Sequence, residues 1–329
     1  EYQISALRVA GSNPAEVTNK RQDFLTFIFF KTHYFTLFVK QSQNLMQTPP
    51  VEYELFLADY IAMFVVVAPF AAIFFTFAFY VTEIVYLRNY KKPLVVFANI
   101  NFLKLSDSRK HILASNFQFY NRLRPKYKHY FEHRVAKLIL HYNFEGRDIE
   151  VTEEMKVAIS ATYVMLTFGM REYLNPLFKR IIIYPDIYYS SQNDNYHKGE
   201  FNPRMECVVF SWKHFKEGID ITNDNLNLGL HEFTHAFHIY ALKSDKATFV
   251  LFNESLQNLF RVVSKPEVKQ RLVESGFLRD YAYENQFEFV AVLLEYFFES
   301  PDEFKLKFPS IFQKVKHMIN YNERYFINE

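Results

Sequence analysis

The longest apolar stretch of the chain lies in its N-terminal third. Ile61–Val81 contains 21 residues without a charged side chain, and only Thr76 among them is clearly polar. About 20 apolar residues in a helix span the hydrocarbon core of a bilayer, whereas a buried helix of a soluble protein rarely lacks polar residues over that length. Pro69 is tolerated inside a membrane helix. The pattern therefore predicts a transmembrane helix at 58–86.

The segment before this span, residues 1–57, gives weaker signals. Residues 1–23 show no periodicity, so no element is assigned to them. The aromatic stretch Phe24–Val39 is interrupted by Lys31 and His33 and is short for a membrane span. We expect it to lie at the membrane interface. The alternative is a second, less apolar span, which would change the topology of the N-terminal part.

The pattern beyond the span is that of a protein with both helices and strands. In the juxtamembrane region, residues 87–143, we expect basic helices at Asp107–Phe131 and His133–Tyr142. Thr152 is a candidate N-cap for a further helix, whose apolar periodicity continues through Leu166.

Two strands are expected in the C-terminal region, residues 144–329. Arg180–Tyr184 has the composition of a buried strand and is closed by Pro185, and Cys207–Trp212 gives a second strand. Helices mixed with a few strands predict an α+β domain.

Charge places this domain relative to the membrane. Bases follow the span at once, and acids precede it: Arg88, Lys91 and Lys92 after it, and Glu52, Glu54 and Asp59 before it. Because lysine and arginine gather on the cytoplasmic side of a span, we expect a single-pass protein of the inner (cytoplasmic) membrane whose larger part faces the cytoplasm. A net charge of +2 gives no indication of a direct nucleic-acid partner. Cys207 is the single cysteine, so an intrachain disulfide is impossible.

The candidate chemistry is concentrated at His231–His235, which has the pattern HExxH. Residues four apart on a helix project from the same face, so both imidazoles can reach one metal ion. Zn²⁺ favours such nitrogen ligands, and Glu232 between them is placed to take a proton from an activated water. Asp224 and Asn225 are candidate N-caps for this helix. The segment therefore predicts a zinc site with a general base.

A zinc site of this kind needs a third protein ligand, and spacing leaves it open. Glu254 follows the motif at a short distance, and Glu288 lies on an apolar helix expected at Asn285–Phe298. Glu295 shares one face of that helix with Glu288, and a carboxylate on such a face is costly to bury unless it is paired or bound to a metal. His238 is a further candidate, although a packing role is more common for such a residue.

Several stretches, in order along the chain, resemble the Mlc titration factor A family of zinc-dependent peptidases. They are Phe144–Val157 (FEGRDIEVTEEMKV), Ile181–Pro185 (IIIYP), Val208–Trp212 (VVFSW), His231–His238 (HEFTHAFH) preceded by Asn227, and Tyr281–Phe298 (YAYENQFEFVAVLLEYFF). The resemblance covers roughly residues 105–320. Tyr281–Glu288 is also similar to the catalytic segment of anthrax lethal factor.

The resemblance implies a zincin-like metallopeptidase domain with a particular set of site residues. It implies that Glu288 is the third metal ligand beside His231 and His235, and that Tyr281 faces the metal. Where the family usually has aspartate, this chain has His238. The resemblance also implies a protein that sequesters a transcriptional repressor.

We therefore expect a membrane-anchored, zinc-dependent peptidase that acts on a peptide or protein substrate. Glu232 is the expected base, and Tyr281 is the expected donor to the developing oxyanion. Val208–Trp212 is expected to be either the edge strand that pairs with substrate or an internal strand. The alternatives are a regulatory binding protein with a cytoplasmic partner such as a transcriptional regulator, and a structural zinc domain. Structural zinc sites usually use four Cys or His ligands, and the chain has no cysteine cluster.

Overall fold

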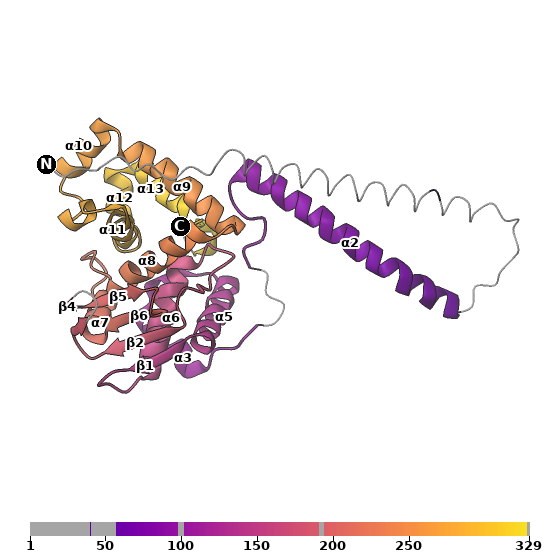
Figure 1. The fold of residues 1–329 in the computed structure, drawn as a ribbon, viewed down its shortest axis with the longest axis horizontal. Helices are drawn as coiled ribbons and strands as arrows, with labels where there is room; N and C mark the ends of the chain where they lie inside the picture. Colours follow the sequence, from indigo (N-terminus) through magenta and orange to yellow (C-terminus); the bar gives the residue numbers. More distant parts are fainter. Residues whose placement is uncertain (1–39, 41–56, 98–101, 191–193, 328–329) are drawn as a thin grey trace, which may run out of the picture. The chain divides into compact units, whose positions relative to one another are not determined.

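The structure is a computed structural model that describes residues 40, 57–97, 102–190 and 194–327 (Figure 1). The chain separates into two units, Glu1–Phe79 and Tyr80–Glu329. The stretch Phe24–Val39, for which we expect an interfacial position, lies outside the described residues.

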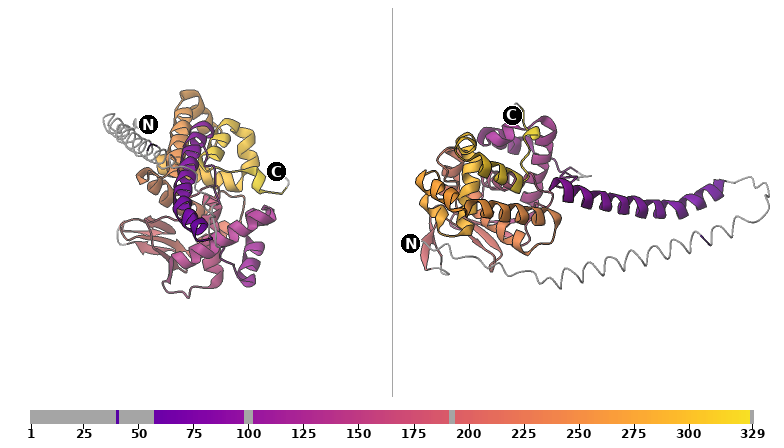
Figure 2. Two further views of the ribbon diagram at one scale, coloured as in Figure 1. Left: turned by 90° about the vertical axis from the view of Figure 1, so that its right-hand side faces the viewer. Right: turned by 90° about the horizontal axis from the view of Figure 1, so that it is seen from above.

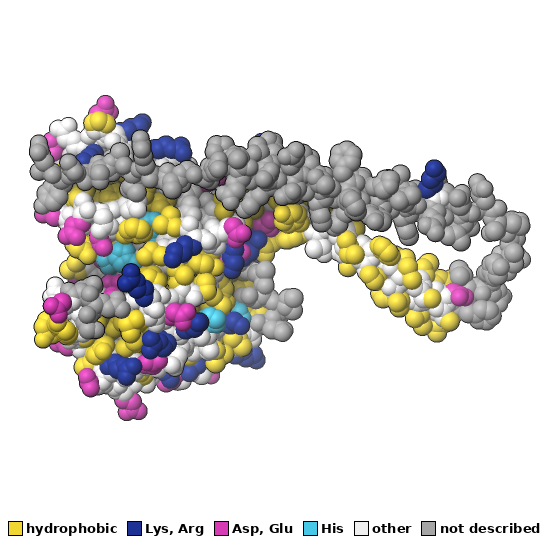
Figure 3. Space-filling view, in the orientation of Figure 1, with side chains coloured by type: hydrophobic (Ala, Val, Ile, Leu, Met, Phe, Trp, Pro, Cys, Tyr) yellow, Lys and Arg dark blue, Asp and Glu magenta, His cyan; other side chains and the backbone are white. Residues whose placement is uncertain are grey.

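Helix α2, Leu57–Tyr90, contains the whole uncharged run and extends beyond the predicted span at 58–86. In the described residues it is the one helix that is long and apolar enough to cross a membrane, judged by length and composition. Its surface is almost wholly apolar (Figure 3). The hydroxyl of Thr76 donates to the carbonyl of Ala72 at 2.7 Å, so this polar group is satisfied within the helix.

Beyond α2, the described residues of the juxtamembrane region form three helices where two were expected: α3 (Asp107–Asn116), α4 (Gln118–Arg122) and α5 (Pro125–His141). The expectation of one continuous helix over Asp107–Phe131 is therefore wrong. The second break has a clear physical reason, because a proline disfavours helical geometry in the residue before it. Arg124 is extended, with ψ 152°, and Pro125 begins α5.

The larger unit contains a four-stranded sheet in the order β1 (Asn143–Gly146), β2 (Arg180–Tyr184), β6 (Cys207–Ser211), β5 (Gly199–Asn202). The first three strands run parallel, and β5 pairs antiparallel with β6. The strand predicted at Arg180–Tyr184 is confirmed. The strand predicted at Cys207–Trp212 ends one residue early and is internal, so the edge position belongs to β5. The hairpin β3 (Tyr188–Ser190) and β4 (Asn195–His197) forms a separate two-stranded sheet.

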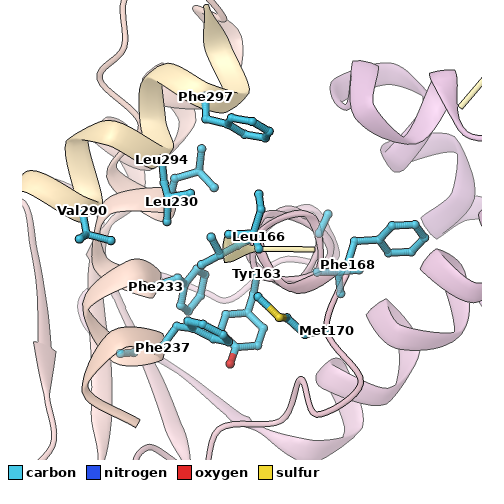
Figure 4. Close-up of a cluster of buried hydrophobic side chains, with 14 of the residues drawn as sticks. Tyr163, Leu166, Phe168, Met170, Leu230, Phe233, Phe237, Val290, Leu294 and Phe297 are labelled. Atoms are coloured by element: carbon cyan, nitrogen blue, oxygen red, sulfur yellow. The ribbon is translucent and has the colours of Figure 1, made fainter. Parts of the chain in front are cut away.

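The helices of the larger unit lie on one side of the four-stranded sheet, where α7 and α8 contact it, and form most of the core (Figures 1 and 2). They include α6 (Glu153–Thr167), α7 (Trp212–Asp220), α8 (Leu228–Lys243), α9 (Ala247–Val263) and α11 (Gln286–Glu299). Thr152 caps α6 as predicted, because its hydroxyl accepts from the Met155 N–H at 3.2 Å. Figure 4 shows Tyr163 of α6 beside Phe233 of α8, with Leu294 of α11 nearby. The expected mixture of helices and strands is confirmed.

The C-terminal third is helical: α10 (Pro266–Glu274), η1 (Asp280–Tyr283), α12 (Pro301–Lys307), α13 (Pro309–Met318) and η2 (Glu323–Tyr325). Helix α11 runs through the core and packs along α8. These two helices carry the residues of the candidate site.

Candidate metal centre

The start of α8 is held by Asn227, and neither Asp224 nor Asn225, the expected caps, has this role. The Asn227 carboxamide oxygen accepts from the Leu230 N–H at 2.9 Å, which satisfies one of the free donors of the first helical turn. Its amide donates to Glu299 at 2.9 Å. The end of α11 and the beginning of α8 are thereby joined.

Three side chains from α8 and α11 converge at one point. His231 Nε2 lies 2.9 Å from Glu288 Oε2, and His235 Nε2 lies 3.4 Å from the same oxygen. The two Nε2 atoms are 3.1 Å apart. Asn285 positions Glu288 in the first turn of α11, because its side-chain oxygen accepts from the Glu288 N–H at 3.1 Å. The three residues form a group that could hold a metal ion.

The spacing of the three atoms fits a tetrahedral zinc site. Zinc–nitrogen and zinc–carboxylate distances near 2.0–2.1 Å give an edge of about 3.3 Å between ligand atoms of a tetrahedron. The three separations in the structure, 2.9, 3.1 and 3.4 Å, lie within a few tenths of an ångström of that edge. Two imidazole nitrogens and a carboxylate oxygen are also the ligand types that zinc prefers.

The other two ligand candidates lie away from this point. Glu254 is half-exposed on α9 and forms an ion pair with Lys91 at 2.9 Å. His238 is buried, and its ring lies 4.7 Å from the ring of Phe287. Burial and the nearby His235 lower the pKa of His238 to about 4, so it is neutral at pH 7. The structure thus brings Glu288, and neither of these residues, to the two histidines.

A buried ion-pair network behind His231 was only partly visible in the sequence. His231 Nδ1 lies 2.8 Å from Glu295 Oε1, and because a carboxylate only accepts, Nδ1 donates, which directs Nε2 toward the metal position. Arg279 contacts both oxygens of Glu295, at 2.7 and 3.0 Å, and the Asn227 N–H donates to Oε2 at 2.9 Å. The shared face of Glu288 and Glu295 indicates that each carboxylate is paired or bound to a metal. No local sequence signal indicates that Arg279 is the partner of Glu295.

The side chain of Glu232 extends from α8 to the edge strand β5. It is buried, and its Oε2 accepts from the backbone N–H of Phe201 at 3.0 Å. Burial raises the pKa of Glu232, and the histidines on either side oppose that shift. Gly199 makes the close approach possible, because a Cβ there would lie 2.9 Å from Glu232 Cγ. One oxygen of the Glu232 carboxylate is therefore held by the backbone of β5.

Tyr281, on η1, faces the same cluster from the other side. Its ring centroid is 5.8 Å from that of His231, and its side chain is 43% exposed. Burial and the carboxylates of Glu288 and Glu284 raise the pKa of Tyr281, so it keeps its proton and can donate.

The electrostatics of the cluster favour a cation at its centre. Burial opposes protonation of His231, but hydrogen bonds to Glu288 and Glu295 outweigh burial and raise its pKa to about 10. His231 and His235 in turn hold the pKa of Glu288 well below its usual range, against the effect of its burial. Carboxylates thus stabilise positive charge at the point where the three ligand atoms meet.

Comparison with known proteins supports this description. A family model described as glucose-regulated metallo-peptidase M90 matches residues 97–319, which is more than half of the chain. A similar protein is an uncharacterized protein of Synechocystis sp. (strain ATCC 27184 / PCC 6803 / Kazusa), which is 23% identical over 62% of this chain and 80% of its own length. The matched region contains every residue of the cluster, and metallopeptidases require a metal. The resemblance noted in the sequence is confirmed: the chain belongs to the M90 family of glucose-regulated metallopeptidases, which is the Mlc titration factor A family.

Proposed function

We propose that this protein is a membrane-anchored zinc peptidase with a zincin-like catalytic domain. The observation that carries the proposal is the convergence of His231, His235 and Glu288 within 3.4 Å of one another, with Glu232 beside them. A purely structural site has no use for a buried carboxylate next to its ligands. In the proposed assignment the three convergent residues are the ligands, and Glu232 is the base.

The chemistry is divided between the metal and the chain. A zinc ion held by these ligands supplies Lewis-acid chemistry, which polarises a carbonyl and makes a water acidic near neutral pH. The oxygen of Glu232 that Phe201 does not occupy receives the proton from the attacking water and passes it to the leaving amine. The raised pKa of Glu232, caused mainly by burial, suits a group that must both accept and release a proton.

Tyr281 completes the proposed set as a hydrogen-bond donor. Its hydroxyl donates to the oxygen of the scissile carbonyl as negative charge develops there. Loss of one such donor typically lowers turnover by about 10²–10³. Its partial exposure leaves it accessible to a substrate that binds beside β5.

The edge strand β5 provides the backbone groups that an extended peptide needs. The Ser211 N–H donates to the Lys198 carbonyl, so Lys198 is a hydrogen-bonded position of the antiparallel pair. Such positions alternate along a strand, so the N–H and C=O groups of Gly199 and Phe201 point away from β6. Glu232 accepts a hydrogen bond from the Phe201 N–H, and the Gly199 N–H and the carbonyls of Gly199 and Phe201 face the free edge of β5. A peptide can add to this edge as a further strand, which makes a peptide or protein the proposed substrate.

Anchoring is proposed through α2, with the catalytic unit in the cytoplasm at the inner membrane. The basic cluster Arg88, Lys91 and Lys92 at the C-terminal end of α2 supports this orientation. A fluorescent protein fused after residue 329 is expected to mature, and a periplasmic phosphatase fused there is expected to stay inactive. An active phosphatase fusion would place the catalytic unit outside and exclude a cytoplasmic partner.

The test of function is zinc analysis combined with cleavage of a peptide library by the full chain in detergent. One zinc per chain with specific cleavage supports a peptidase. Zinc without cleavage would favour the second function that the resemblance implied, a regulatory binding protein that captures a cytoplasmic transcriptional regulator. Absence of zinc binding would exclude the assignment of His231, His235 and Glu288 as zinc ligands.

A further inference from the structure

The edge strand β5 carries a carboxylate, Glu200, that the proposed hydrolysis does not use. Glu200 pairs with Val209 of β6, and Val209 pairs with Ile182 of β2, so these side chains share one face of the sheet. That face is opposite the helices of the main core. It is covered by Tyr188 of the β3–β4 hairpin, which packs with Ile182 and Val209 in a small second cluster.

Glu200 has neutral hydrogen-bond partners and, within the described residues, no ion-pair partner. Its Oε1 accepts from the Asn202 amide at 3.1 Å, and its Oε2 accepts from the Ser190 hydroxyl at 3.0 Å. Arg180 lies on the same face of the sheet, but it is paired with Glu145 at 3.6 Å. Glu200 is only partly exposed, so its negative charge is incompletely screened by solvent.

Tyr188 adds a polar group that has no partner among the described residues. The residue is 7% exposed, and its hydroxyl is buried with no hydrogen-bond partner in that part of the chain. Tyr188 packs against Val209, the β6 residue opposite Glu200, so both polar residues lie on this face of the sheet beside β5. A buried hydroxyl without a partner is unfavourable, so a group that donates to it would stabilise this site.

A peptide added to β5 would present a side chain to this place. Side chains of a strand alternate between the two faces of a sheet, and residues directly opposite on neighbouring strands have Cβ atoms about 4.5–5.5 Å apart. A peptide residue opposite Glu200 therefore points its side chain toward the same outer face. Phe201, the next residue of β5, holds Glu232 through its N–H, so this subsite is close to the scissile bond.

We propose that Glu200 and Tyr188 form a specificity subsite that selects a lysine or arginine side chain of the substrate peptide. The proposal rests on the proposed peptidase function. Both cationic side chains carry only hydrogen-bond donors, and Glu200 and the Tyr188 oxygen are acceptors for them. Glutamine and leucine would leave the charge of Glu200 uncompensated, and glutamate would repel it.

The experiment measures kcat/KM of the full chain in detergent for peptides that are acetylated at the N-terminus and amidated at the C-terminus. Each peptide carries a single arginine, lysine, glutamine or glutamate, moved through the positions around the cleaved bond. At one position arginine and lysine are expected to exceed glutamine by about 10- to 100-fold, the range of a charge-assisted hydrogen bond. Glu200→Gln is expected to remove this preference and leave cleavage of the glutamine peptide within about threefold of wild type.

Two further variants separate the subsite from general effects. Glu206→Gln removes the same charge from the exposed turn after β5, where Glu206 pairs with Lys179, and is expected to keep the preference. Tyr188→Phe removes only the hydroxyl and is expected to lower the preference about three- to tenfold. Melting temperatures identify any variant that is misfolded.

The outcomes distinguish failure of the subsite from failure of the function. Cleavage by wild type without a basic preference, or a preference that survives both Glu200→Gln and Tyr188→Phe, would overturn the subsite and leave the peptidase intact. Peptides with a free N-terminus are measured beside the acetylated ones. If Glu200 increases cleavage only of peptides with a free N-terminus, it binds the α-ammonium group, and the proposed side-chain subsite is overturned. Absence of any cleavage by wild type would overturn the proposed function itself.

Discussion

Replacing Glu295 by glutamine tests the ion-pair network behind the metal position. Glu295 accepts from His231 Nδ1 at 2.8 Å and from Arg279 at 2.7 and 3.0 Å. Glutamine has one acceptor oxygen, and its amide group would face one of these donors. The substitution therefore removes the anionic partner of Arg279 and loosens the orientation of His231.

The structure sets the expected size of both effects. Removal of one partner from a fully buried pair costs about 3–5 kcal/mol. Because the side chain of Arg279 is 24% exposed, we expect about 2–3 kcal/mol of lost stability. Loss of an outer hydrogen bond to a ligating histidine typically weakens metal binding 10- to 100-fold, and the same range is expected here.

The assay is zinc competition against a chelator, with thermal unfolding of the zinc-free protein measured in parallel. Glu303→Gln is the matched control, because Glu303 forms an exposed pair with Lys307 on α12, and such pairs contribute only about 0–1 kcal/mol. Zinc affinity of Glu295→Gln within about threefold of wild type would refute the view that this network orients His231.

Further substitutions give three independent tests. Glu288→Ala is expected to abolish tight zinc binding and Glu254→Ala to leave it unchanged; the reverse pattern in zinc titration would exchange their roles. Gly199→Ala places a Cβ 2.9 Å from Cγ of Glu232, so kcat is expected to fall about 10- to 100-fold with zinc retained, and an unchanged kcat would contradict the close packing. Burial raises the pKa of Glu299 from its ordinary 4.5 to about 8, so the folded state holds the proton more tightly and stability falls as pH rises from 4.5 to 8. Glu299→Gln should flatten that fall by about 1–3 kcal/mol in unfolding measured across this window, and an identical pH profile would remove Glu299 as its cause.

Local sequence signals predicted those parts of the structure that depend on neighbouring residues. The spacing of His231 and His235 predicted two imidazoles on one helical face, and Thr152 marked the start of α6. The apolar run Arg180–Tyr184 predicted a buried strand. Pro125 marks a helix start in the sequence as well, but the basic periodicity on both sides of it predicts one continuous helix, which the structure divides.

Features that depend on long-range packing could not be predicted in the same way. Spacing alone left Glu254 and Glu288 equal, because the choice depends on how α9 and α11 pack against α8. Arg279 meets Glu295 from a separate loop, and no periodicity connects them. The strand β5 has only four residues and includes Gly199, so its pattern is too short to indicate an edge strand.

The central claim is that Glu232 is the base of a zinc-dependent hydrolysis, and Glu232→Gln tests it most directly. Glutamine keeps the size of the side chain and an oxygen that can accept from Phe201, but it cannot accept the proton of a water at neutral pH. The measurement is zinc stoichiometry together with the single-turnover rate of peptide cleavage. We predict unchanged zinc content and a rate at least about 10²-fold lower than wild type. Cleavage at the wild-type rate by the zinc-loaded variant would contradict the account.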